Sequence, residues 1–570
     1  MPQPLTATVQ SRFPARFPTA GALLAALALT ATACTSGAAA PLSDTGTDVP
    51  VRRGGSLVIG AEQEPDCADW IGTCGASVWG TYLMQAQTIP QVFDVRLKGK
   101  NWTPVPSNLM AYEPTTKLVG KQQRITYRLN PKAVWSDGKP ITSADLKYTA
   151  LQVRDSKAIF DKSGYDRITS IATPDSTTAV VTLRSPYGNW KQLFGAGYGV
   201  LPSHLLRGKD RGAVMKDGYS FSGGPWKIAS WKKGVSVTLV PNDRYWGPKP
   251  HLDKVTFQFA SDTSAAIQAF SGGTFDALYP TPQLTTADQI KALGGAARMQ
   301  VQSQTGNLQA LWLNNAKFPF DSSAVRKAFA YSVDREAIVK RLFGSYGVTA
   351  PAQSFQSPLL SRYASTDFSG YQPDAAKAER LMKADGWTKD GSGFWTKNGK
   401  KAAFTVTSLA GNQSRELTEQ ILQSQLAKAG FRMTIKNSTP ANIFGRIAPA
   451  GDFQLGLWNL TDSFPNPTLS ATFSGTAIPS AANHQSGINF MRIRVPGLDP
   501  VLERVDTELD DTARIEASHR AEKLIADSVP SLPLAAVPNV LVTGKRVGGP
   551  LSINPVEGPW WNLEDWGLAK

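Results

Sequence analysis

Short runs in which apolar and polar residues alternate, as in half-buried strands, are separated along the chain by turn signals and helical spacing. One such run precedes an Asp-Gly-Lys-Pro turn, and its apolar members are Ile125, Tyr127 and Leu129. After the turn, Thr142 and Asp145 have the spacing of a capping box, in which each side chain accepts a hydrogen bond from a backbone N–H. The pattern therefore predicts a strand, a turn and a helix that begins at Ser143.

A strand, helix and strand pattern lies farther along. Apolar residues alternate at 404–408 and again at 431–435. Between them we predict a helix within Ser414 to Ala429, ended by Gly430. Such an order favours two parallel strands joined by a right-handed crossover. The second half of the chain is therefore predicted to contain an open α/β sheet.

A further predicted strand at 453–457 runs directly into a polar loop. Trp458 and Asp462 stand at its carboxyl end. Open α/β sheets bind ligands in the crevice beyond the carboxyl ends of their strands. These two residues therefore mark a candidate binding site.

Composition narrows the class of protein. The chain has 570 residues, of which 41% are hydrophobic and 18% charged, as in a soluble globular protein with two or three lobes. Its net charge of +15 is spread without a long basic block. Basic and aromatic residues are not interleaved as in a nucleic-acid module, so a solvated basic surface is favoured and no nucleic-acid partner is expected.

The N-terminus has the features of an export signal. Arg12 and Arg16 precede an apolar run at 20–30 that is too short to span a bilayer as a lasting helix. Ala-Thr-Ala then leads to Cys34, and residues 34–54 are small and polar, as in a flexible tether. A plain secretory peptide is the alternative, and it would leave Cys34 as a free thiol.

Two further cysteines, Cys67 and Cys74, are seven residues apart. In an exported chain they are expected to form a disulfide, with a stabilisation of about 2 to 3 kcal/mol from loop closure. A metal site is the alternative interpretation. The chain has only four histidines and none is near these cysteines in sequence, so we expect no metal.

Five sequence segments, taken together and in their order along the chain, resemble those of a known protein family. The segments are 134–146, 222–246, 271–276, 320–338 and 458–467. They resemble the family 5 extracellular solute-binding proteins, which are the dipeptide- and oligopeptide-binding components of ABC importers. The sequence around Cys34 likewise resembles a bacterial lipobox, with Ala31 where leucine is usual. That resemblance implies a lipid on Cys34 after removal of residues 1–33.

The family resemblance implies an α/β, two-lobed periplasmic-binding-protein-like fold of the large oligopeptide-binding type, with an extra subdomain in the first lobe. Lobe I would comprise residues 51–309, and lobe II residues 310–533. Residues 534–570 would return to lobe I, with hinge strands near Ala310 and Pro533.

The resemblance also implies ligand-binding residues. Asp462 would pair with the α-ammonium of a peptide, and a loop-capping role is the alternative. Trp458 would either stack on the ligand or pack beneath Asp462. Asn489 and Phe490 resemble a segment beside the cleft, and Glu64 lies in the loop that follows the opening strand.

Capture rather than catalysis is the expected function. The sequence contains no P-loop, HExxH, GxSxG or Cys-His cluster, and we expect no cofactor. The partners would be a peptide, an ABC permease with its ATPase, and the outer face of the cell membrane through the lipid, with the protein itself a monomer. The same fold also takes oligosaccharides, nickel complexes or haem, and the 15 tryptophans suit sugar stacking. A cell-surface hydrolase with a carboxylate pair is the alternative from another class.

Overall fold

The computed structural model describes residues 47–72, 74, 78–157, 159, 162–461, 464–465, 469–481 and 487–570. The predicted signal segment 1–33 and Cys34 lie outside these ranges. Within them, no helix combines the length and the apolar character needed to cross a membrane.

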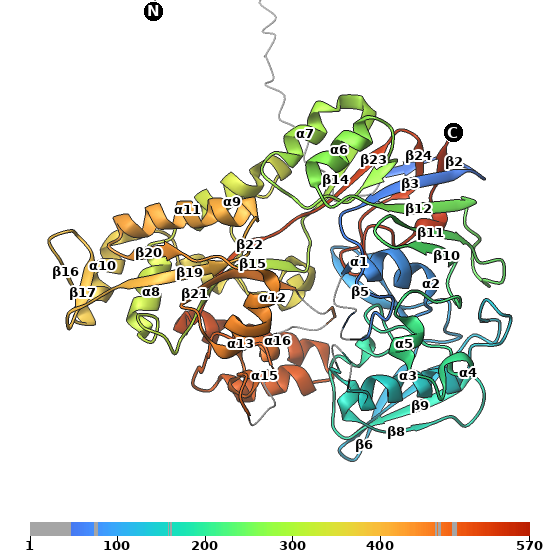
Figure 1. Ribbon diagram of the computed structural model, residues 1–570. Helices are drawn as coiled ribbons and strands as arrows, with labels where there is room; N and C mark the ends of the chain where they lie inside the picture. Colours follow the sequence, from blue (N-terminus) through green and yellow to red (C-terminus); the bar gives the residue numbers. More distant parts are fainter. Residues whose placement is uncertain are drawn as a thin grey trace, which may run out of the picture. The chain divides into compact units, whose positions relative to one another are not determined.

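A seven-stranded sheet contains β3, near the start of the described chain, together with strands from much later in the sequence (Figure 1). Its order is β10 (Trp226–Lys232), β11 (Ser236–Pro241), β12 (Lys254–Phe259), β3 (Ser56–Ala61), β13 (Ala277–Leu278), β23 (Asn539–Gly544) and β14 (Ala297–Gln302). β3 runs parallel to β12 and β13, and Leu57 and Ile59 on it are fully buried. The sheet is therefore built from segments at both ends of the chain.

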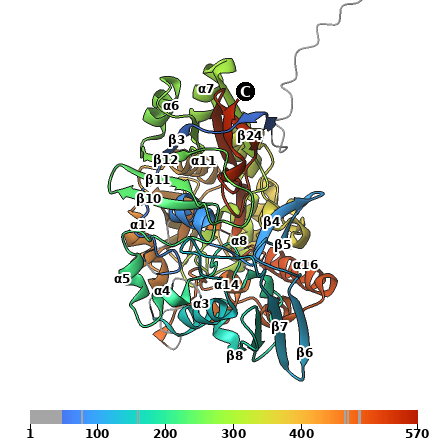
Figure 2. The same ribbon diagram turned by 90° about the vertical axis from the view of Figure 1, so that its right-hand side faces the viewer.

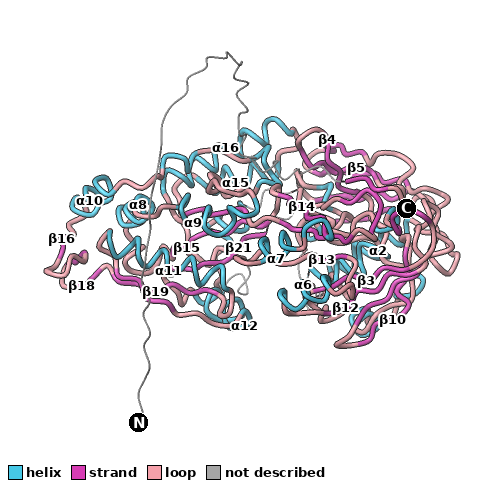
Figure 3. Tube along the Cα trace, turned by 90° about the horizontal axis from the view of Figure 1, so that it is seen from above, coloured by secondary structure: helices cyan, strands magenta, loops and turns pink. Residues whose placement is uncertain are grey.

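A five-stranded sheet forms the centre of the second half (Figure 3). Its order is β20 (Arg432–Ile435), β19 (Ala403–Ser408), β21 (Leu455–Thr461), β15 (Asn307–Leu313) and β22 (Leu532–Ala536). β19 is parallel to β20 and to β21, and α11 (Gln413–Lys428) connects β19 to β20. The predicted parallel strand, helix, strand unit is confirmed.

Other helices belong to the second half of the chain. They are α8 (Ser323–Tyr331), α9 (Arg335–Phe343), α10 (Ala375–Ala384), α15 (Leu498–Thr507) and α16 (Asp511–Ser528). Their apolar residues join those of the five-stranded sheet in one hydrophobic core, which contains Trp312 and Phe329. A second core packs around Leu57, Trp135 and Trp560. The first of these cores also includes Leu278, Val301 and Val540 of the seven-stranded sheet, so apolar packing is continuous from one large sheet to the other.

A separate four-stranded sheet lies beside α3 (Ser143–Asp155) (Figure 2). Its order is β6 (Thr115–Val119), β7 (Gln122–Arg128), β9 (Thr178–Leu183) and β8 (Ile168–Ala172). The predicted capping box at the start of α3 is confirmed, since the Thr142 N–H donates to Asp145 Oδ2 at 2.8 Å. The other Asp145 oxygen accepts from the backbone of Ser203, and the indole of Trp135 is fully buried nearby. This turn therefore organises the core of the small sheet.

Two short connections join the large sheets. Residues 303–306 link β14 to β15, and residues 537–538 link β22 to β23. Ala310 and Pro533, predicted to lie at the hinge, pair with each other inside the five-stranded sheet. The lobe boundaries at 309/310 and 533/534 stay predictions. The chain passes from one large sheet to the other at residues 303–306 and 537–538, a few residues away from these boundaries.

The C-terminal segment returns to the N-terminal strands. β24 (Val547–Leu551) pairs with β1 (Thr47–Val49), and β25 (Gly567–Ala569) pairs with β2 (Val51–Arg52). Between the large sheets and the small one, β4 (Phe93–Lys98) and β5 (Asn101–Pro106) form a hairpin.

Candidate functional site

A cavity of about 490 Å³ lies where the two large sheets approach each other. Glu62 follows β3 of the first sheet, and Asn459 and Thr461 belong to the carboxyl end of β21 in the second. Gly306 and Val537, from the two connections, also line it. The volume is that of an ordinary small-molecule site, and its place at strand ends is the usual one for α/β sheets.

Aromatic side chains form much of the wall. The lining members are Trp70, Trp79, Tyr82, Phe93, Tyr198, Tyr279 and Phe464. Trp79, Tyr82 and Tyr279 make a triangle of edge-on contacts, with ring centroids 6.0 to 6.2 Å apart. Such contacts fix the rings, so a ligand meets a preformed apolar surface.

Few charged groups face this cavity. Among the described lining residues, Glu62 and Lys191 carry charge. Glu62 accepts hydrogen bonds from the hydroxyl of Thr263 at 2.7 Å and from the backbone N–H and hydroxyl of Thr281 at 3.0 and 2.7 Å. Asn459 Oδ1 is buried and has no partner among the described residues. The wall therefore offers a fixed carboxylate as acceptor for a hydrogen-bond donor on the ligand.

A small apolar cluster joins the lobes beside the cavity. It consists of Val95, Trp102 and Leu359, with Phe464 and Val556 packed against it. Leu359 and Phe464 also line a second cavity of about 310 Å³. The two cavities therefore share a wall.

The model of the bacterial extracellular solute-binding proteins, family 5 (its middle region), matches residues 114–478. The chain belongs to this family. As a family 5 solute-binding protein it is similar to the oligopeptide-binding protein OppA of Mycobacterium tuberculosis, with 26% identity over 504 residues, 86% of this chain and 81% of that protein. It is 25% identical to the dipeptide-binding protein DppE of Bacillus subtilis over 477 residues, 79% of this chain and 82% of that protein.

Solved structures share the two-lobed fold. The periplasmic EDTA-binding protein EppA superposes with a TM-score of 0.80 at 20% identity, covering 92% of this chain and 98% of that one. The oligopeptide-binding protein AppA of Bacillus subtilis, in complex with a nonapeptide, gives a TM-score of 0.73 at 21% identity, covering 91% and 100%. The predicted family and the predicted α/β fold are confirmed.

In this family 5 protein, Asp462 lies outside the described residues. Thr461 and Phe464, the nearest described residues on either side, both line the cavity. The α-ammonium contact stays a prediction for Asp462.

Trp458 does not line the cavity. Its ring is 5% exposed and packs edge-on against Phe444 and Phe453, with centroids 5.9 and 5.1 Å apart. Successive side chains of a strand point to opposite faces, so Trp458 lies on the other face of β21 from Asn459 and Thr461. Trp458 thus packs against Phe444 and Phe453, and its predicted role at the ligand stays a prediction.

The other three predicted ligand residues also lie outside the cavity wall. Asn489 is fully buried, and its amide bonds the backbone of Ser474 and Ile493, so it organises a loop. Phe490 packs against the core of the second lobe. Glu64 accepts hydrogen bonds from the Trp231 indole at 2.9 Å and from the Gly234 N–H at 3.0 Å. The binding roles of these residues stay predictions.

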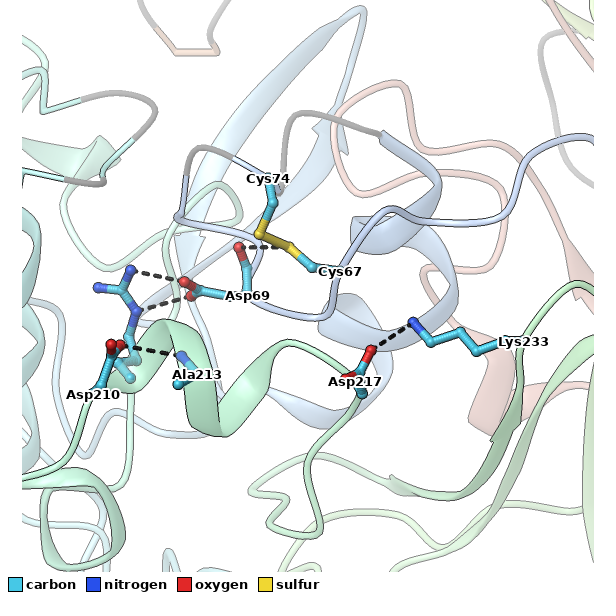
Figure 4. The surroundings of a disulfide bond; sticks show 8 residues. Cys67, Asp69, Cys74, Asp210, Ala213, Asp217 and Lys233 are labelled. Atoms are coloured by element: carbon cyan, nitrogen blue, oxygen red, sulfur yellow. Dashed lines mark hydrogen bonds and ion pairs between the residues drawn. A yellow bond between two sulfur atoms is a disulfide. The ribbon is translucent and has the colours of Figure 1, made fainter.

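The cysteine loop contributes to the wall. Cys67 and Cys74 are joined in a disulfide (Figure 4). Trp70 and Ile71, which lie between them in sequence, line the cavity. Asp69 forms a two-pronged ion pair with Arg211 at 2.9 and 2.8 Å, with both side chains almost completely buried. The described residues contain no group of three or more metal-ligating side chains.

Sequence reasoning missed most of the aromatic wall. One signal was present, because the family resemblance places the loop after the opening strand at the cleft, and Trp70 belongs to that loop. The same loop contains Glu62, which faces the cavity, whereas the predicted Glu64 bonds Trp231 and Gly234. Phe464 lies in the segment 458–467, which the family resemblance also marks, and the remaining aromatic residues carry no comparable signal.

Proposed function

We propose that this protein captures a peptide in the 490 Å³ cavity and delivers it to an ABC permease, whose ATPase partner drives release. The supporting observation is that both large sheets and both connections line one cavity. A rotation about residues 303–306 and 537–538 would therefore open and close it. The names of OppA and DppE, among the similar proteins, add support for a peptide.

Closure supplies the signal to the permease. A ligand shifts the open and closed populations only through contacts that one of the two states makes better. Asn459 and Thr461 lie on one side of the cavity, and Glu62 with the Trp79 triangle lies on the other. A peptide that touches both sides stabilises the closed state, and the closed state presents both lobes to the membrane partner.

Location and chemistry complete the proposal. The basic and apolar start of the chain and the lipobox-like sequence before Cys34 support export and lipid anchoring at the outer face of the cell membrane. The protein acts as a monomeric binding component and turns over no substrate.

Native mass spectrometry of protein purified from its own source tests the ligand class, because a co-purified solute has a measurable mass. A bound peptide is the expected result, and small-angle scattering should show compaction when peptide is added to stripped protein. A bound sugar, metal complex or haem would overturn the peptide assignment. Turnover of the solute would overturn the binding role.

A further inference from the structure

The second cavity continues the first. Pro104, Lys191, Leu359, Phe464 and Pro465 belong to the walls of both. The cavities of about 490 and 310 Å³ are therefore direct neighbours. Because both lobes supply the wall, the second cavity is part of the closed form.

The charges of the second cavity are unbalanced. Lys191, Arg362 and Arg514 line it with one carboxylate, Asp511, which leaves a net charge of +2. Asp511 is shared, because it accepts from Arg362 Nη2 at 2.7 Å and from Arg514 Nη2 at 2.8 Å. Two guanidinium groups thus depend on one carboxylate, and the cavity keeps an excess of positive charge.

Lys191 stands at the junction. Its ammonium lies 5.9 Å from the centroid of Phe93, which lines the first cavity, and 5.6 Å from that of Trp190, which lines the second. Its partner Glu113 is 3.5 Å away and has a side chain that is 65% exposed, so water weakens that ion pair. The ammonium is therefore available to a ligand at the point where the cavities meet.

We propose that the second cavity is a subsite for the carboxylate end of the ligand, with Lys191 and Arg362 as its cationic contacts. This rests on the proposed function, since it orients a peptide whose body fills the first cavity. An arginine offers a planar fork that matches a carboxylate, and an ammonium adds a point charge.

Calorimetric titration of stripped protein with one peptide, as free acid and as C-terminal amide, tests the subsite. The wild type should bind the acid about tenfold tighter than the amide, a typical effect of a charge-assisted contact. In Lys191→Gln/Arg362→Gln the acid-to-amide affinity ratio should fall toward one. Both side chains are about one-third exposed, so the fold should tolerate the change, and the melting temperature checks this.

The matched control is Lys209→Gln, which removes an exposed lysine that lines neither cavity and should keep the wild-type ratio. A C-terminally amidated peptide that ends in glutamate carries its carboxylate on a side chain instead of at the chain end. If this peptide binds more tightly than the amide without glutamate, the subsite also accepts a side-chain carboxylate. Equal binding of acid and amide by the wild type, or an unchanged ratio in the double variant, overturns the subsite alone. A wild type that binds neither peptide overturns the proposed function together with it.

Discussion

Removal of the disulfide should both destabilise the first lobe and weaken ligand binding. The Cys67–Cys74 bond closes a short loop, with a sequence separation of 7. The loop-closure relation gives about 2.5 kcal/mol at 25 °C for a ring of that size. An unfolding entropy of about 2.1 cal/mol/K per residue, over a cooperative unit of about 300 residues, converts this to a fall of about 4 °C in melting temperature.

The effect on binding follows from the residues inside the loop. Trp70 and Ile71 line the cavity, and the Trp70 indole donates to the carbonyl of Tyr198 at 2.9 Å. Without the disulfide, the buried Asp69–Arg211 pair still holds the loop on one side. A partly loosened wall should therefore weaken ligand affinity by about threefold to tenfold, because ordering it is a cost of binding.

Differential scanning fluorimetry and calorimetric titration of Cys67→Ser/Cys74→Ser provide the measurement. Asp66→Asn, an exposed change beside the loop, is the control and should leave both values unchanged. A double variant with wild-type melting temperature and wild-type affinity would refute the assignment of the loop to the ligand wall.

Three further predictions concern the site and the core. Tyr279→Ala removes one member of the aromatic triangle and should weaken peptide affinity by about 1 to 2 kcal/mol in calorimetric titration, whereas Tyr112→Ala, an exposed ring outside the wall, should not. Asp462→Asn should lower affinity for a peptide with a free α-ammonium and spare the N-acetylated form; equal losses for both forms would remove the amine anchor. Burial raises the pKa of Glu522 from 4.5 to about 7, although Phe355 N–H and the Ser365 hydroxyl bond its oxygens. The folded state therefore holds the proton of Glu522 more tightly than the unfolded state does. The resulting contribution to the free energy of unfolding, about 3 kcal/mol, is fully present below about pH 4.5 and is lost as the pH rises through 7. The free energy of unfolding of Glu522→Gln, measured with denaturant at several pH values, should lack this decrease between pH 4.5 and 7. A pH profile identical to that of the wild type would contradict the prediction.

The sequence by itself determined the local elements and the family. Alternation and capping residues placed the strand, turn and helix around Thr142, and the parallel unit that contains α11, because these features depend on neighbours within one or two turns of chain. The order of several family-like sequence segments along one chain identified the fold. The short spacing of Cys67 and Cys74 predicted the disulfide that the structure contains.

Only the tertiary structure decided which side chains meet in the cavity. β21 is the middle strand of its sheet and is buried along most of its length, so its sequence does not reveal that Asn459 faces the cavity and Trp458 the core. A shift of one residue exchanges the two faces of a strand, and the sheet register sets that choice. Trp70, Tyr279 and Val537 are likewise brought together from distant positions by two sheets and two connections, because packing between lobes leaves no periodic trace in the local sequence.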